Sequence, residues 1–251
     1  MLILLPPSET KADGGDGPPL DLDRLSFPEL NATRKELAHE LVALAADLPA
    51  SRAALGVSAR QDAEITRNAA LWSSPTSPAL RRYTGVLYDA LDYPSLRGAA
   101  ADRAAARLAV GSALFGLVRA DDPVPAYRLS AGSVLPGRPG LTTFWRPLLE
   151  PVLAEVDELV VDLRSGSYAA LGRVPQAVTV TVLSQRPDGS RTAVSHFNKA
   201  HKGRVARLLA GSRAEPADAR DVARLLRRAG MHVESSGPAG AALELVLPAH
   251  E

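Results

Sequence analysis

The chain has 251 residues, of which 46% are hydrophobic and 23% are charged, the mixture typical of a globular protein with a sizeable core. Its formal net charge of +1 excludes a generally polybasic protein, so any affinity for nucleic acid has to come from a local patch. It contains no cysteine, which excludes disulfides, thiolate nucleophiles and cysteine-based metal centres.

The opening segment, MLILLPPSETK, predicts a short buried strand that runs into a Pro-Pro turn. It differs from a signal peptide because it has no basic start and its apolar run is too short. No stretch approaches the roughly 20 apolar residues that span a bilayer, so we expect a soluble cytoplasmic protein with no membrane partner. If the strand is central, Glu9 and Lys11 lie at the carboxyl edge of the sheet, where open α/β sheets bind ligands.

The first half of the chain predicts helices separated by breaks. Leucines at helical spacing predict a helix over residues 30–47, and a second helix is expected over residues 58–70. Residues 11–23, rich in Gly, Pro and Asp, predict a mobile loop. Residues 81–91 predict a turn that leads into a helix, and residues 103–118, which are apolar nearly all round, indicate a buried segment.

The second half gives the clearest local signal, a β-hairpin over residues 177–197, in which two β-rich runs flank a Pro-Asp-Gly turn. The other elements expected here are a Pro-rich connection ending in a short strand (115–129), a helix with Pro147 in its first turn (147–157), a strand (158–163), two helices (199–211 and 217–229) and two strands (231–235 and 242–248). Strands and helices alternate without an internal repeat or a linker. This pattern predicts a single α/β domain over residues 1–251, with a mixed sheet flanked by helices.

Several familiar catalytic motifs are missing from the sequence. It contains no phosphate-binding loop, no dinucleotide-binding turn and no nucleophile elbow. No two histidines have the i, i+4 spacing of a helical metal site, and the nearest pair, His196 and His201, has no carboxylate between its members and lysines beside it. We therefore expect no metal site and no cofactor.

The segment 195–213 is strongly basic and contains no carboxylate. On a helical wheel over residues 199–210, Val205 and Leu209 fall on one side, and the cations fall on the other side around Gly203. Glycine costs a helix about 1 kcal/mol relative to alanine, but it lets an anion approach the backbone. We interpret this face as a phosphate-binding surface, and the alternative is a solvated face that pairs with acidic residues elsewhere. Its cations are Lys199, Lys202, Arg204 and Arg207, and Arg213 follows in the same basic segment.

Other polar groups have both a structural and a functional interpretation. Arg119 and Asp122 are spaced to tie down a loop as an ion pair, whereas Arg128 leaves an apolar, Pro-fixed segment and needs an anionic partner. Thr84 and Gly85 either cap a helix or belong to an aromatic-lined ligand wall. Residues 165–168 supply small donors after a strand and are typical of an anion nest.

Six stretches in chain order resemble the YaaA family of peroxide stress proteins. They are MLILLPPSETK, YTGVLYDAL, GSALFGLVRADDPVPAYRL, FW, VVDLRSGSY and NKAHKGRVARLL, and they span residues 1 to about 210. The resemblance implies a compact α/β fold with a helix-hairpin-helix and a positively charged cleft. It also implies binding to double-stranded and branched DNA, and a role in limiting iron-driven oxidative damage. The cleft residues that it carries over are Thr84, Gly85, Ser112, Gly116, Arg119, Asp122, Tyr127, Arg128, Ser165, Tyr168, Lys199, Gly203 and Arg207.

The chain departs from the family pattern at some of these motifs. Glu9 stands where family members commonly have lysine, and Lys11 follows two residues later, which reverses a charge at the expected cleft. Ala120 replaces a proline, and the basic stretch KAHKG is one residue longer than its counterpart. The match fades after about residue 210, so nothing is carried over beyond that point.

These features leave two hypotheses of function. The first is a DNA-binding protein of the peroxide stress response, and the alternative is an enzyme that acts on a nucleobase, a nucleotide or a similar phosphate-bearing molecule in the same cleft. The candidate phosphate or DNA contacts are Lys11, Arg128, Lys199, Lys202, Gly203, Arg204 and Arg207. The candidate cleft residues are Thr84, Gly85, Tyr88, Ser112, Gly116, Arg119, Ser165 and Tyr168. For the enzyme alternative, the candidate catalytic residues are Glu9, Asp122 and Tyr127.

Overall fold

The chain begins as a buried strand in the middle of a mixed sheet. The structure is a computed structural model that describes residues 1–193, 197–237 and 241–248. In it, β1 (Leu2–Leu5) pairs in parallel with β4 (Leu108–Ser112) on one side and with β7 (Val160–Asp162) on the other. All four residues of β1 are completely buried, because a central parallel strand faces the core on both sides. The segment after β1 therefore does start at the carboxyl edge of the sheet.

The main sheet combines parallel and antiparallel strands in the order β10-β11-β8-β7-β1-β4-β5, and β9 pairs with β8 beside this path. Its parallel part continues through β8 (Val178–Gln185) and β11 (Ala242–Pro248). By contrast, β5 (Gly116–Arg119), β9 (Arg191–Ala193) and β10 (Val233–Ser236) pair with their neighbours in antiparallel fashion. The fold is thus α/β with a mixed sheet of eight strands, as the alternation of elements predicts.

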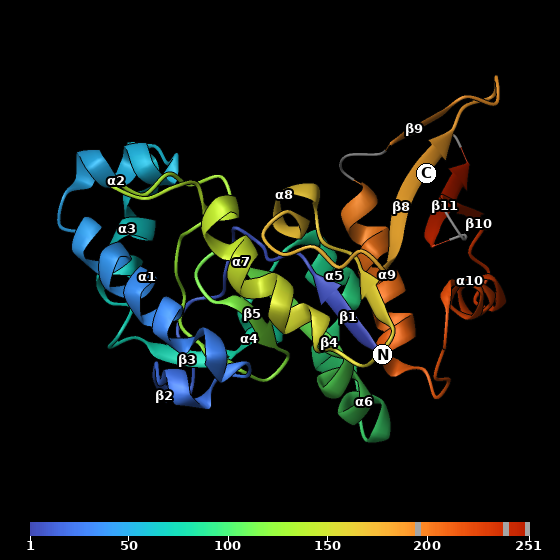
Figure 1. Ribbon diagram of the computed structural model, residues 1–251, viewed down its shortest axis with the longest axis horizontal. Coiled ribbons are helices and arrows are strands. Elements are labelled where there is room, and N and C mark those ends of the chain that lie inside the picture. The colour runs from blue at the N-terminus through green and yellow to red at the C-terminus, as the bar shows by residue number, and fades with distance from the viewer. Residues whose placement is uncertain (194–196, 238–240, 249–251) are drawn as a thin grey trace.

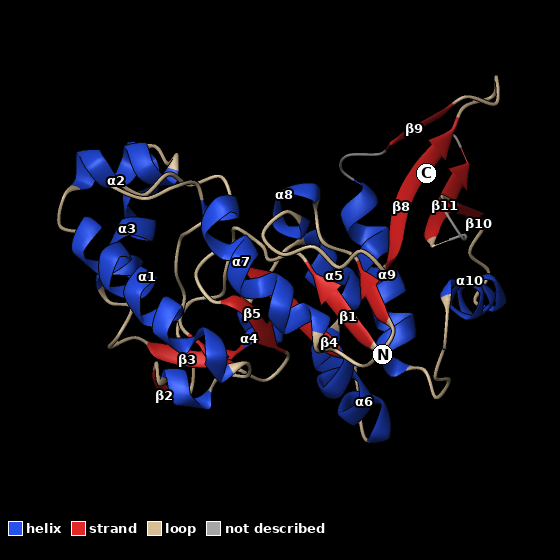
Figure 2. Cartoon of the chain, viewed as in Figure 1, coloured by secondary structure: helices blue, strands red, loops and turns tan. Residues whose placement is uncertain are grey.

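Helices flank this sheet, and a group of them forms one end of the molecule. Figure 1 shows α1 to α3 gathered with a small sheet at the end opposite β8 to β11, and Figure 2 shows the main sheet with helices around it. The helices are α1 (Asn31–Leu44), α2 (Leu48–Leu55), α3 (Asp62–Ala69), α4 (Ala79–Arg82), α5 (Val86–Leu91), α6 (Ala99–Arg107), α7 (Leu141–Ala154), α8 (Gly166–Ala169), α9 (Phe197–Gly211) and α10 (Ala219–Arg228). The small sheet consists of β2 (Gly17–Pro19), β3 (Pro75–Pro78) and β6 (Pro123–Val124).

The predicted helices and strands near the two ends of the chain are confirmed, whereas several segments between them differ. Residues 11–23 are not simply a loop, because β2 lies within them and pairs with β3. Residues 103–118 contain the end of α6 and the β4–β5 hairpin, and the short strand expected near residue 129 is replaced by β5 and β6. The helix expected at 147–157 already begins at Leu141, so Pro147 lies inside α7. The described part of the predicted hairpin is β8 and β9, and residues 194–196 lie outside the description.

A buried arginine fastens the helical end of the molecule to the main sheet. The Arg34 side chain on α1 is completely buried, and its guanidinium donates hydrogen bonds to the carbonyl oxygens of Phe115 (2.9 Å) and Leu117 (2.7 Å). It also donates to the carbonyl of Ser26 at 2.8 Å. These acceptors belong to the β4–β5 turn, to β5 and to the segment before α1, so one side chain joins three separate parts of the fold. Burial lowers the pKa of Arg34 to about 10.

The part of the chain that the structure describes includes no helix that combines the length and the apolar composition needed to cross a membrane.

Candidate functional site

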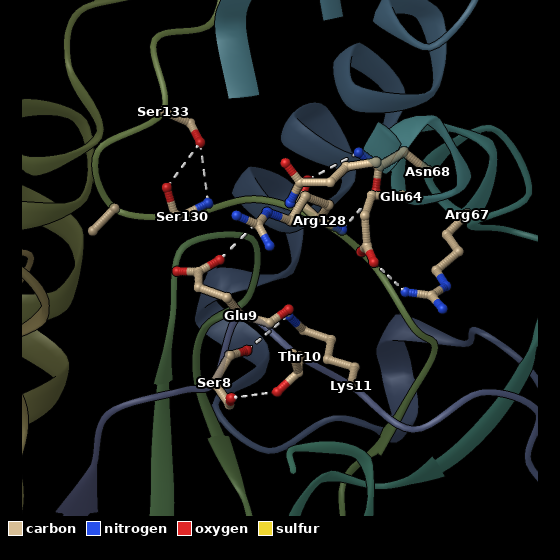
Figure 3. A network of polar contacts seen from close by, with 12 residues as sticks. Ser8, Glu9, Thr10, Lys11, Glu64, Arg67, Asn68, Arg128, Ser130 and Ser133 are labelled. Carbon is tan, nitrogen blue, oxygen red and sulfur yellow. Dashed lines mark hydrogen bonds and ion pairs between the residues drawn. The ribbon is translucent and has the colours of Figure 1, made fainter. Parts of the chain in front are cut away.

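Polar residues gather where β1 ends. We call Ser8, Glu9, Thr10, Lys11 and Arg128 the β1-end cluster (Figure 3). The hydroxyl oxygens of Ser8 and Thr10 lie 3.0 Å apart, and the Lys11 ammonium donates a hydrogen bond to the Ser8 carbonyl at 3.0 Å. A parallel sheet presents the carboxyl ends of its strands at one edge, which is the usual ligand position in open α/β folds.

The loop of the β1-end cluster is fixed against the segment that leads into α5. Lys11 and Tyr83 form an isolated antiparallel bridge, and the Thr84 amide donates to the Thr10 carbonyl at 3.3 Å. One residue later, the Ala12 amide donates to the Arg82 carbonyl at 2.9 Å. The polar groups after β1 are therefore held in place by backbone hydrogen bonds.

Lys11 is the one buried lysine among the described residues, with 8% of its surface exposed. Its ammonium lies 4.2 Å from the centre of the Tyr127 ring and 5.5 Å from that of Tyr83. Burial lowers its pKa from 10.5 to about 8, although the nearby carboxylate of Glu9 acts in the opposite direction. A lysine with this pKa exchanges its proton near physiological pH.

Glu9 and Arg128 face each other across the cluster without a hydrogen bond. The distance from Arg128 Nε to Glu9 Oε2 is 3.5 Å, and each of these two atoms is buried without a hydrogen-bond partner among the described residues. The Glu9 side chain as a whole is 42% exposed and that of Arg128 is 16% exposed. The anionic partner that the sequence analysis expected for Arg128 is thus Glu9, at a distance longer than a charge-assisted hydrogen bond of about 2.8 Å.

Asn68 on α3 positions Arg128 through its backbone. The Asn68 side-chain amide donates to the Arg128 carbonyl at 2.9 Å, and the Arg128 amide donates to the Asn68 side-chain oxygen at 2.8 Å. Asn68 is 1% exposed, so this pair of bonds lies in the interior. The helical end of the molecule is coupled to the β1-end cluster at this point.

Tyr168 on α8 lies close to the same cluster. Its side chain is buried, and its hydroxyl accepts a hydrogen bond from the Ala131 amide at 3.3 Å. Burial, followed by the charge of Glu9, raises the pKa of Tyr168, so its phenol is protonated at neutral pH. Ser165, directly before α8, is exposed, and its hydroxyl lies 3.3 Å from that of Ser167.

A chain of three buried hydroxyls runs beneath Lys11. The hydroxyl oxygens of Tyr83 and Tyr127 lie 2.9 Å apart, and those of Tyr127 and Ser112 lie 2.7 Å apart. Burial raises the pKa of Tyr83 to about 12 and that of Tyr127 well above 10. Tyr127 therefore stays protonated at neutral pH, and its ring packs against the Lys11 ammonium, so the structure shows a supporting contact for this candidate catalytic residue. Ser112 is also buried, and its hydroxyl accepts hydrogen bonds from the amides of Leu114 and Phe115 in the β4–β5 turn.

Asp122 holds a loop in place and is not available as a general base. Its carboxylate accepts hydrogen bonds from the Ser26 amide (3.1 Å), the Ser26 hydroxyl (2.8 Å) and the Arg119 amide (2.9 Å). The expected ion pair between Arg119 and Asp122 is wrong, because the Arg119 guanidinium donates to the Ala106 carbonyl at 2.7 Å instead. Asp122 is 6% exposed, and these bonds account for its burial.

The basic helix α9 packs most of its predicted anion-binding residues into the protein. Gly203 is buried, and a β-carbon there would lie 2.2 Å from the Leu87 carbonyl oxygen, so the expected approach of an anion is wrong. Lys202 donates to the Leu163 carbonyl at 3.1 Å, and Arg207 donates to the Leu91 carbonyl at 2.8 Å. Of the other cations predicted on this helix, two are exposed, Lys199 and Arg204.

The remaining cleft residues divide between packing and surface. Thr84 makes no capping hydrogen bond to α5. The residue directly before this helix is Gly85, whose backbone lies in the left-handed region (φ 100°). A cavity of about 470 Å³ is lined by Tyr83, Thr84 and Tyr88 among others, and no residue of the β1-end cluster lines it. Tyr88 is buried and donates to the Pro6 carbonyl at 2.8 Å. Gly116 serves packing, because a β-carbon there would lie 2.8 Å from the Trp145 ring.

Two residues that build the site, Asn68 and Tyr83, were not predicted from the sequence. Asn68 lies inside the predicted helix 58–70, where no local pattern marks it, because its partner is 60 positions away in the chain. Tyr83 stands within the stretch that contains Thr84 and Gly85, and its contacts with Lys11 and Tyr127 assign it to the site. Within residues 1–193, 197–237 and 241–248 there is no group of three His, Asp or Glu side chains arranged to hold a metal ion.

Comparisons of the sequence with known proteins found one matching family model and several similar proteins. A family model described as peroxide stress protein YaaA matches residues 1–234. A UPF0246 protein of Corynebacterium efficiens is 53% identical over 240 residues, which cover 93% of this chain and 95% of that protein. A UPF0246 protein of Streptomyces coelicolor is 44% identical over 247 residues, covering 95% of this chain and 94% of that protein. An uncharacterized protein of Campylobacter jejuni is 28% identical over 207 residues, covering 81% and 82%.

Proposed function

Because the chain belongs to the YaaA family of peroxide stress proteins, we propose that it acts in the peroxide stress response by binding DNA, double-stranded or branched. The contacts go to the phosphate backbone, since the exposed cations are not accompanied by a set of side chains suited to reading base edges in a groove. The near-neutral net charge fits a protein that binds DNA through a limited surface.

The observation that carries this proposal is the pair of helices α2 and α3 at one end of the molecule. Gly56 ends α2 in the left-handed conformation (φ 64°), is exposed, and has open space around its α-carbon. The single-turn helix η3 (Ala59–Gln61) follows, with Arg60 exposed. The amides of Val57 and Ser58 already donate hydrogen bonds within the turn, so the group that the turn offers to a phosphate is the Arg60 cation. We assign the helix-hairpin-helix of the family to these two helices.

Exposed cations on α9 are a second candidate contact. Lys199 and Arg204 have no ion pair within the described residues, in contrast to Arg207, which lies 3.5 Å from the Asp92 carboxylate. Lys199 and Arg204 therefore remain the residues of the predicted basic face that are available to a DNA backbone.

A titration of a labelled duplex and a branched junction at several salt concentrations tests this proposal. The logarithm of the wild-type binding constant should fall steeply with the logarithm of the salt concentration, because each phosphate contact releases counterions. Arg60→Ala should weaken binding on both DNA forms and reduce that slope by about one. Arg228→Ala, a surface change on α10, is the matched control and should leave the slope unchanged.

An absence of binding to either DNA form at low salt would contradict DNA binding. A slope that Arg60→Ala and Arg228→Ala alter equally would leave DNA binding standing and would remove α2 and α3 from the contact surface.

One observation favours the alternative, an enzyme that acts on a nucleobase or nucleotide. Burial lowers the pKa of Lys11 to about 8, and its ammonium is held at the end of β1 by the Ser8 carbonyl, so on this alternative Lys11 is the group that exchanges a proton with the ligand. On this alternative, millimolar mononucleotides should raise the melting temperature of the protein and should compete with DNA. Protection by a nucleotide that Lys11→Met abolishes would favour the enzyme over the DNA-binding protein.

A further inference from the structure

The β1-end cluster contains an incomplete ion pair. Arg128 Nε and Glu9 Oε2 are 3.5 Å apart, and both atoms are buried without a hydrogen-bond partner among the described residues. Buried polar atoms in proteins are nearly always hydrogen-bonded, and a carboxylate and a guanidinium that pair for stability approach to about 2.8 Å. The arrangement thus leaves one strong acceptor and one strong donor beside each other without partners, and both atoms are covered from solvent.

A donor beside an acceptor is the hydrogen-bonding pattern of a nucleobase edge. An exocyclic amine or a ring N–H donates, and the neighbouring ring nitrogen or carbonyl accepts. Glu9 accepts from the first group, and Arg128 donates to the second. A phosphate group fits this site less well, because the Glu9 carboxylate repels it.

We propose that Glu9 and Arg128 bind the donor–acceptor edge of one nucleobase that has left the base stack. The proposal rests on the DNA binding proposed above and adds a base-binding site to it. Enzymes and repair proteins that act on a base take it out of the duplex and hold its edge by hydrogen bonds of this kind. The Glu9 side chain is 42% exposed, so a base can approach it from solvent, and the two side chains have to part before Glu9 Oε2 and Arg128 Nε meet the base.

The β1-end cluster lies where a nucleotide of DNA bound at the helical end of the molecule would reach it. Asn68 on α3 holds the backbone of Arg128 through two hydrogen bonds of 2.8 and 2.9 Å. The Asn68 side chain thereby links α3, one of the two helices proposed to bind DNA, to the backbone of Arg128. The hydroxyls of Ser8 and Thr10, which lie 3.0 Å apart on the same loop, are suited to contact the sugar or phosphate of that nucleotide.

A duplex with 2-aminopurine opposite a mismatch tests the proposal, because 2-aminopurine carries an amine next to a ring nitrogen and fluoresces more strongly outside the stack. Saturating wild-type protein should raise the fluorescence about threefold as the base leaves the duplex. Glu9→Gln should abolish this rise, because the neutral amide oxygen accepts much more weakly from the amine of the base than the carboxylate does. Glu155→Gln, a carboxyl-to-amide change on the exposed end of α7, is the matched control and should keep the rise. Thermal melts confirm that both variants fold.

A second arm uses the free nucleosides and separates this proposal from DNA binding. 2-Aminopurine riboside should bind wild-type protein about tenfold more tightly than purine riboside, which lacks the amine, and Glu9→Gln should remove this preference. If the riboside shows the preference and DNA does not bind, the base site stands and the proposed DNA binding fails. If DNA binds without a fluorescence rise and the riboside shows no preference, the base site is overturned and DNA binding stands. A rise that persists in Glu9→Gln also overturns the base site.

Discussion

Gly203 in α9 lies so close to Leu87 in α5 that a β-carbon at position 203 would be 2.2 Å from the Leu87 carbonyl oxygen. The same β-carbon would lie 2.8 Å from the side chain of Ala90. Glycine is therefore required at the crossing of two helix backbones, and the basic residues around it have no part in that requirement. The crossing also fixes α5, whose first residues follow Gly85 beside Ser8 and Thr10.

Substitution Gly203→Ala should destabilise the protein. Overpacking against a backbone carbonyl costs about 3 kcal/mol, and the better helix propensity of alanine returns about 1 kcal/mol, so we expect a net loss of about 2 kcal/mol. Urea denaturation measures this loss. Gly132→Ala, at a position with nothing within 4 Å of the added β-carbon, is the control, and its effect should stay within about 0.5 kcal/mol. Equal effects of the two substitutions would contradict the close crossing.

The cations of α9 should separate into two groups by experiment. Arg207 donates hydrogen bonds to the carbonyls of Leu91 and Asp92, so Arg207→Ala should lower the free energy of unfolding by about 1–2 kcal/mol and leave the salt dependence of DNA binding unchanged. Lys199→Ala combined with Arg204→Ala should do the opposite, with little effect on stability and a salt slope reduced by about two. A reduced slope in Arg207→Ala would show that this side chain leaves its carbonyl partners to bind DNA.

The parts of the fold that depend on local patterns were predictable from the sequence. The apolar run Leu2–Leu5 predicts a buried strand, and the Pro-Asp-Gly turn predicts the pairing of β8 with β9, because side-chain period and turn chemistry act over a few residues. The position of Glu9 and Lys11 at the carboxyl edge of the sheet was predictable for a similar reason, since they directly follow a strand that proved to be central.

The parts that depend on distant partners were not predictable. A helical wheel places Gly203 among cations, but it does not reveal that α5 crosses α9 there. The spacing of Arg119 and Asp122 suggests an ion pair, yet Asp122 pairs with Ser26, which is 96 positions away. Polar side chains form hydrogen bonds with groups that are near them in the folded structure, and those that become buried nearly always have such a partner.

Arg34 should be among the most sensitive positions in the molecule. Arg34→Met leaves the carbonyls of Phe115, Leu117 and Ser26 without their donor, and each unsatisfied buried acceptor costs about 1–3 kcal/mol. We expect a loss of about 4 kcal/mol in the free energy of unfolding, measured by urea denaturation. Lys35→Ala, an exposed change at the next position of α1, should have an effect within about 0.5 kcal/mol. A loss below 1 kcal/mol in Arg34→Met would contradict the role of Arg34 as a fastener of α1 to the sheet.

Lys11 should make the stability of the protein depend on pH. Its pKa is about 8 in the folded chain and 10.5 as the ordinary value, so between these pH values the unfolded chain holds a proton that the folded chain has lost. The free energy of unfolding therefore rises with pH in this window, by about 2–3 kcal/mol from pH 8 to pH 10, and the cost of the buried charge is fully present below pH 8. Lys11→Met should remove this rise. Urea denaturation of both proteins from pH 7 to pH 10 measures the difference, in a range where Tyr83, with a pKa of about 12, stays protonated in the folded chain. Parallel pH profiles for the two proteins would show that Lys11 keeps its ordinary pKa. That result would also contradict the proton-transfer role of Lys11 in the enzyme alternative.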